Sequence, residues 1–154
     1  MPPSSGAAPA QFSDLAPGDT AGVITMMRQV MQRIDAGLPS MTERDTLLAS
    51  IADSQSRRLA VWLEGATVRK LVVSDSSGNG PGTGETDVWF LGGDVAVVQQ
   101  VSDVYAFDAG RIVLWTDGSL EPRTDVTPDM IMIRESALID RVRQWLAVLG
   151  IPLP

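Results

Sequence analysis

The sequence predicts an α+β fold, with an antiparallel sheet of about six strands in a meander and with two N-terminal helices and one C-terminal helix packed on one face. Three observations predict it. Apolar residues recur every three or four positions near both ends of the chain, as in amphipathic helices. Between these ends apolar and polar residues alternate, as in strands. The turns between the expected strands are short, and parallel strands would need crossovers of a dozen residues or more.

The first 18 residues are rich in Pro, Ala and Ser. This composition predicts a flexible leader over residues 1–18, followed by a single domain over residues 19–154. The first helix is expected to begin at Asp19 or Thr20, since either side chain can cap a helix, and to end at Gly37. Its apolar stripe consists of Val23, Met27, Val30, Ile34 and Leu38.

Two further helices are expected. Residues 40–43 have the S-x-x-E form of a capping box, which predicts a short second helix. The C-terminal helix should begin with Thr127 as its cap and Pro128 at its first position. The apolar residues that follow are Leu47, Leu48 and Ile51 in the second helix, and Leu138, Val142, Trp145 and Leu149 in the third.

The middle of the chain should form the sheet. Gly-containing turns near residues 64–65, 92–94 and 108–110 separate runs of alternating apolar and polar residues, as expected for hairpins. A longer polar loop is expected at 75–85. The six expected strands are residues 57–63, 68–74, 86–91, 95–102, 104–107 and 111–116.

The alternation along these strands predicts that three tryptophans lie together. Successive residues of a strand point to opposite faces of the sheet. On three of the strands an apolar set faces one side, and a tryptophan lies with the charged residues on the other. These residues are Trp62, Trp89 and Trp115. When the apolar side faces the helices, all three tryptophans lie on the open face of the sheet.

We therefore expect a binding surface on that face. Exposed aromatic patches mark contact surfaces, and tryptophan is enriched at binding hot spots. Arg58 and Arg111 lie on the same side as Trp62, Trp89 and Trp115 and complete the expected site. The competing interpretation is that a helix or the leader covers the tryptophans, because large aromatic residues are mostly buried.

Composition excludes several classes of function. The net charge is −7, the sequence pI is about 4.4, and no cluster of basic residues is present, which disfavours nucleic acid and anionic membranes as partners. The absence of Cys and His excludes disulfides, thiol nucleophiles, Cys/His zinc sites and Ser-His-Asp triads. The chain contains no run of 18 apolar residues, so no transmembrane helix is predicted. No cofactor is expected.

One loop resembles part of a calcium site. Asp75, Ser77 and Asn79 occupy positions 1, 3 and 5 of a calcium loop, and Gly80 occupies position 6. Position 12 is Thr86 instead of glutamate, and a strand rather than a helix precedes the loop. A polar hairpin loop explains the same residues, so no metal site is expected and calcium is kept only as an alternative.

Three functions stay open at this stage. The leading one is a non-enzymatic envelope or secreted module that binds another protein, or a second copy of itself, through the open sheet face. The second is a carrier of a small apolar ligand held between helices and sheet. The third is a carboxylate-dependent hydrolase, for which no pair of acids stands out. The expected lining of the carrier's pocket is Met27, Val30, Phe90 and Leu114.

Two segments carry a resemblance to known proteins. Residues 89–95 (WFLGGDV) and 105–112 (YAFDAGRI) each have the form aromatic strand, Gly/Asp turn, apolar strand. In this layout the chain resembles a loose group of small uncharacterised bacterial proteins, many of them envelope lipoproteins. The resemblance implies a periplasmic or extracellular location with a signal segment removed, rather than a cytoplasmic one. It implies no activity, and the lipid-bearing cysteine of such proteins has no counterpart in this chain.

Overall fold

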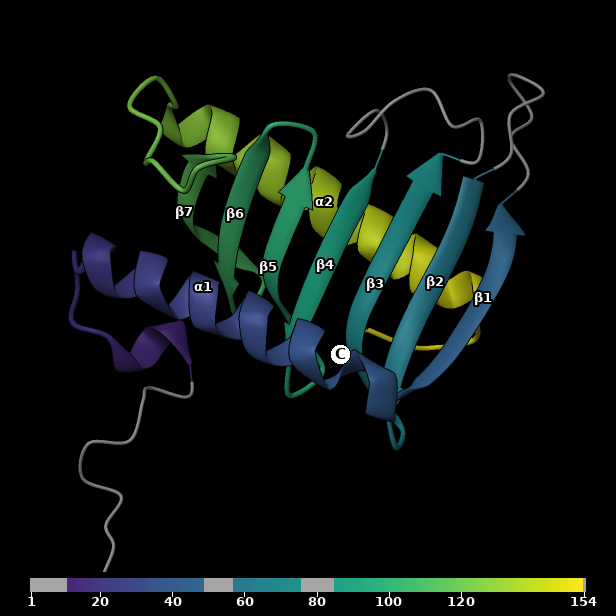
Figure 1. Ribbon diagram of the computed structural model, residues 1–154. Coiled ribbons are helices and arrows are strands. Elements are labelled where there is room, and N and C mark those ends of the chain that lie inside the picture. The colour runs from purple at the N-terminus through teal and green to yellow at the C-terminus, as the bar shows by residue number, and fades with distance from the viewer. Residues whose placement is uncertain (1–10, 49–56, 76–84, 154) are drawn as a thin grey trace, which may run out of the picture.

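The computed structural model describes residues 11–48, 57–75 and 85–153. Seven strands in this part of the chain form one antiparallel sheet whose spatial order follows the sequence, β1 to β7 (Figure 1). The elements are η1 (Phe12–Asp14), α1 (Thr20–Gly37), η2 (Leu38–Ser40), β1 (Thr42–Leu48), β2 (Arg57–Glu64), β3 (Thr67–Asp75), β4 (Thr86–Leu91), β5 (Asp94–Gln100), β6 (Asp103–Asp108), β7 (Arg111–Asp117) and α2 (Pro128–Val148). The predicted α+β class with an antiparallel meander is confirmed, and the six predicted strands correspond to β2–β7.

A capped helix precedes the strands of the sheet in the sequence, and another follows them. The Asp19 carboxylate accepts a hydrogen bond from the Gly22 amide at 2.9 Å, so the predicted cap of α1 is confirmed. The Thr127 hydroxyl accepts one from the Met130 amide at 3.1 Å, and Pro128 begins α2. Each cap satisfies a backbone N–H that has no partner inside its helix.

The predicted second N-terminal helix is wrong, because its residues form the edge strand β1. All seven residues of β1 are paired with β2, from Thr42 opposite Leu63 to Leu48 opposite Arg57. An S-x-x-E pattern stabilises a helix by about 1 kcal/mol, and seven residues of pairing outweigh that local preference. Ile51, which was expected to continue the helix, lies outside the described residues.

The two helices lie on opposite faces of the sheet, so the prediction that all helices pack on one face is also wrong. In Figure 1, α1 crosses the front of the sheet and α2 runs behind it. The alternation of β4 shows the same division. Val88 and Phe90 belong to the apolar cluster under α2, whereas Trp89 belongs to the cluster under α1. The sheet therefore has two cores, and no whole face is left open.

The chain before α1 also contributes to the α1 core. Phe12, within the segment expected to be a leader, is buried among the residues that α1 packs against the sheet. Its short 3-10 helix η1 contacts β6. The connection from η1 to α1 therefore passes close to the edge of the sheet formed by β6 and β7.

Three irregular pairings change which face a side chain points to. Ala106 pairs with Leu114 and Phe107 pairs with Ile112, so Val113 has no partner and forms a bulge in β7. In the same way Ala96 is the extra residue of β5 and Arg69 that of β3. Each extra residue reverses the alternation of its strand beyond that point. The sequence-based assignment of faces assumed a regular strand in each case.

Candidate functional site

The three tryptophans do not share an open face of the sheet, so that prediction is wrong. Trp89 is 3% exposed under α1, which covers its part of the sheet. The bulge at Val113 turns Trp115 to the opposite face, where it is 7% exposed in the α2 core. Only Trp62 remains half-buried outside both apolar clusters.

The remaining expected site residues are also separated. Arg58 lies on the α1 side of β2, four residues before Trp62, whereas Arg111 is exposed at the start of the opposite edge strand β7. The expected ligand pocket between helices and sheet is not formed as predicted. Phe90 lies in the α2 core, while Met27 and Val30 are packed under α1.

One part of the sheet is covered by neither helix on its α1 side. This part extends over β1–β3, beyond the end of α1 (Figure 1). Directly paired residues of an antiparallel sheet point to the same side. Two rows result, Glu43–Trp62–Lys70 and Asp45–Ala60–Val72–Asp87. We call this surface the charged face, and it comprises Asp35, Glu43, Asp45, Arg58, Trp62, Lys70, Glu85 and Asp87.

Lys70 is the centre of the charged face. It is the only lysine of the chain and is 7% exposed. Its Nζ donates to Asp35 Oδ1 at 2.7 Å and lies 3.8 Å from Asp87 Oδ2. The same Asp35 oxygen accepts the indole N–H of Trp89 at 2.9 Å, and Nζ lies 4.7 Å from the Trp89 ring centroid. The network ties the last turns of α1 to β3 and β4.

Arg58 is held between two acids at the outer side of the charged face. Its Nη2 lies 2.7 Å from Asp45 Oδ2 and 2.8 Å from Glu43 Oε2. The hydrogen bond to Asp45, followed by that to Glu43, raises the pKa of the Arg58 guanidinium. Its positive charge is therefore matched by two carboxylates within the protein.

The charged face carries an excess of negative charge. Five carboxylates, of Asp35, Glu43, Asp45, Glu85 and Asp87, surround the two basic side chains of Arg58 and Lys70. The excess agrees in sign with the net charge of −7. Cationic groups are the complementary partners of such a surface.

Asp87 is the member of the charged face with an unusual protonation equilibrium. Burial raises its pKa from 3.8 to about 6, and Glu85 and Asp35 act in the same direction, whereas Lys70 lowers it. The side chain is 20% exposed. Near pH 6 the carboxyl group therefore exchanges a proton with solvent, in contact with a buried lysine.

The raised pKa of Asp87 predicts a stability effect. Because the folded state binds the proton more tightly than the unfolded chain, this group makes the protein less stable as the pH rises from about 4 to about 6. Asp87→Asn should remove this decrease of stability with rising pH, and should raise the free energy of unfolding by about 1 kcal/mol at pH 7.5. Urea unfolding across this pH range measures it, with the exposed Asp140→Asn as the control. If Asp87→Asn is less stable than wild type at pH 7.5 and still loses stability between pH 4 and pH 6, the raised pKa of Asp87 is not the cause of this pH dependence.

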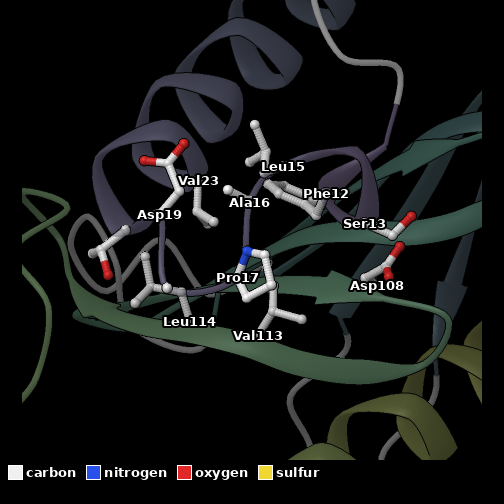
Figure 2. Close-up of a pocket in the computed structure, with 12 residues that line it drawn as sticks. Phe12, Ser13, Leu15, Ala16, Pro17, Asp19, Val23, Asp108, Val113 and Leu114 are labelled. Carbon is white, nitrogen blue, oxygen red and sulfur yellow. The ribbon is translucent and has the colours of Figure 1, made fainter.

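A separate pocket lies at the β7 edge of the sheet. Its volume is about 240 Å³, and it is a half-open pocket between the connection from η1 to α1 on one side and β7 on the other. Figure 2 shows Pro17 and Val23 facing the strand that carries Val113 and Leu114, with Ser13 and Asp108 at one end. Of the lining residues, only Leu114 was predicted from the sequence to line a pocket. The wall formed by residues 12–18 was not predicted, because the composition of this segment indicates a flexible leader.

In the described ranges no group of three or more Asp, Glu, His or Cys side chains is arranged to hold a metal ion. The alternative calcium ligands Ser77 and Asn79 lie outside these ranges, as does the side chain of Asp75. No helix in the described part of the chain has the length and apolar character needed to cross a membrane.

Comparison of the chain with models of protein families, with curated proteins and with solved structures gave no significant match. The class of the protein is therefore defined by its structure alone, which is an α+β fold with an antiparallel meander sheet.

Proposed function

We propose that the protein is a non-enzymatic binding module that takes a basic segment of a partner protein on the charged face. The observation that carries the proposal is a half-buried tryptophan on the same surface as five carboxylates, on a part of the sheet's α1 side that no described helix covers. Trp62 offers an aromatic surface on which a lysine or arginine side chain can stack.

The ion pairs of the charged face give this surface a fixed shape. Lys70 and Asp35 anchor its inner side to α1, and Arg58 holds Glu43 and Asp45 together at its outer side. A surface that is ordered before binding loses less conformational entropy when the partner arrives. The excess negative charge then attracts basic segments and repels acidic ones.

Fluorescence polarisation with short peptides tests this function. The full chain should bind a labelled twelve-residue peptide of alternating Lys and Gly, and should not bind the Glu/Gly counterpart. Trp62→Ala should weaken binding by about tenfold, because an aromatic contact at the centre of the surface is lost. Glu43→Gln combined with Asp45→Asn should weaken it further, and added salt should do the same.

The controls separate a site from general attraction by a negative protein. Met132→Ala removes an exposed apolar side chain from α2, on the other side of the sheet, and should leave binding unchanged. Equal binding of the basic peptide by wild type and by Trp62→Ala would refute the charged face as the binding surface. A preference for the acidic peptide would refute the basic partner.

A further inference from the structure

The pocket at the β7 edge is independent of the charged face. It lies at the opposite edge of the sheet from β1 and β2, and none of the residues of the charged face lines it. Its walls are mostly apolar. The apolar lining residues are Phe12, Leu15, Ala16, Pro17, Val23, Val113 and Leu114.

The size of the pocket limits what it can hold. A cavity of about 150 Å³ accommodates a benzene ring. A volume of about 240 Å³ therefore accommodates a ring with a short aliphatic chain, or about ten non-hydrogen atoms. Val113, the bulge residue of β7, is 46% exposed beneath this space, so an apolar ligand would cover surface that is now in contact with water.

The polar lining selects the sign of a ligand's charge. The lining includes the carboxylates of Asp19 and Asp108 but no basic side chain. Asp19 is engaged as the cap of α1. Asp108 makes no side-chain hydrogen bond or ion pair among the described residues, and it lies half-buried beside the hydroxyl-bearing Ser13 (Figure 2). A donor with a positive charge would complete this end of the pocket.

We propose that this pocket binds a small amphipathic amine, with its apolar body between Pro17 and Val113 and its ammonium group at Asp108. The apolar part supplies the affinity by covering Val113 and Leu114, and the ammonium group fixes the orientation. Anionic ligands of the same shape are excluded by the two carboxylates.

Three probes with one apolar body test the proposal: 3-phenylpropylamine, 3-phenylpropan-1-ol and 3-phenylpropanoate. Ligand-observed NMR titrations against the full chain should give millimolar or tighter binding of the amine, as expected for about ten non-hydrogen atoms. The alcohol should bind about fivefold more weakly, and the carboxylate should not bind. Asp108→Asn should abolish the difference between amine and alcohol. Asparagine suits the same tight turn, where Ala109 and Gly110 have positive φ.

A second variant distinguishes this pocket from other surfaces. Ala16→Trp fills the cavity from an exposed position, so it should abolish amine binding while the domain stays folded. Ala137→Trp introduces the same side chain at an exposed position of α2 and should leave amine binding unchanged. Amine binding that survives Ala16→Trp, absence of binding of all three probes, or binding of the carboxylate equal to that of the amine would overturn the proposal. Peptide binding at the charged face should be unaffected by Ala16→Trp, so the two sites can fail separately.

Discussion

Replacement of Trp115 by alanine is expected to lower the free energy of unfolding by about 3–5 kcal/mol, the usual cost of removing a large aromatic side chain from a core. The indole is 7% exposed, and its ring centroid lies 5.1 Å from that of Tyr105. Its N–H donates to Asp103 Oδ2 at 3.0 Å. The substitution therefore leaves a cavity and removes a hydrogen bond from a buried carboxylate at the same time.

The surroundings of Trp115 extend this effect to α2. Arg134 lies over the indole, with its Cζ 5.1 Å from the ring centroid, and donates a hydrogen bond to the Tyr105 hydroxyl. Arg123 Nη2 donates to the other oxygen of Asp103 at 2.9 Å. Loss of the ring removes the surface on which the Arg134 guanidinium stacks. We therefore expect weaker packing of α2 against β6 and β7.

Equilibrium unfolding in urea measures the effect, and Trp62→Ala is the matched comparison. Because Trp62 is outside both cores, its replacement should cost less than about 1 kcal/mol. Domains have a total free energy of unfolding of about 5–15 kcal/mol, so the loss expected for Trp115→Ala can be enough to unfold this one. If it does, Trp115→Phe can be measured instead. This variant keeps a ring but loses the N–H, and its free energy of unfolding should be lower by about 1–2 kcal/mol. Equal, small losses for Trp62→Ala and Trp115→Ala would mean that both side chains lie on the surface.

The sequence was sufficient for the fold class because the relevant signals are local. Turns such as residues 92–93 and 109–110 need positive φ, and both hairpins have it. Asp19 and Thr127 cap their helices through atoms three residues away. Short hairpins then leave an antiparallel meander as the arrangement for β2–β7. None of these inferences depends on distant parts of the chain.

The errors arose where distant contacts decide the structure. A helix-capping pattern at residues 40–43 predicts a helix, but pairing with β2 makes residues 42–48 a strand. The extra residue at Val113 has no marker in the sequence such as glycine, and it moves Trp115 to the other face. The side of the sheet on which each helix lies is likewise decided by tertiary packing. Without it, Trp89 was placed on an open surface instead of under α1.

The network around Lys70 was not predicted from the sequence. Lys70 is the only lysine of the chain, but its partners Asp35 and Asp87 come from α1 and β4, and only the tertiary fold brings them together. The pocket at β7 was beyond prediction because it depends on how Phe12 anchors the preceding connection. Trp62 and Arg58 do lie together on the α1 side of β2, since no bulge intervenes between them. They are the part of the expected site that the structure brings together.

Replacement of Lys70 by methionine should produce the second large effect, a loss of about 2 kcal/mol at pH 8. Removing one partner of a buried ion pair costs about 3–5 kcal/mol, and the value is smaller here because the Asp35 side chain is 46% exposed to solvent. Methionine retains the length and apolar stem of lysine, so the loss reports the charge. Asp35 would keep only its hydrogen bond from Trp89, and Asp87 would lose its nearby cation.

The loss should depend on pH in a definite direction. Lys70 lowers the pKa of Asp87, so its removal raises that pKa further above 6 and keeps the carboxyl group protonated to higher pH. A carboxyl group with a raised pKa destabilises the fold only where it must ionise. The deficit of Lys70→Met should therefore be largest at pH 8 and clearly smaller at pH 5, and Lys70→Met combined with Asp87→Asn should recover about half of it.

Arg143→Met is the matched control for this series. Arg143 forms an exposed pair with Asp140 at 3.2 Å, and such a pair contributes less than about 0.5 kcal/mol. Its replacement should therefore change stability little at either pH. A deficit of Lys70→Met that is the same at pH 5 and pH 8, and that Asp87→Asn does not reduce, would show that packing of the lysine stem against Trp89 carries the stability. In that case the charges of the charged face would serve binding rather than folding, and Lys70→Met would alter peptide affinity more than it alters the fold.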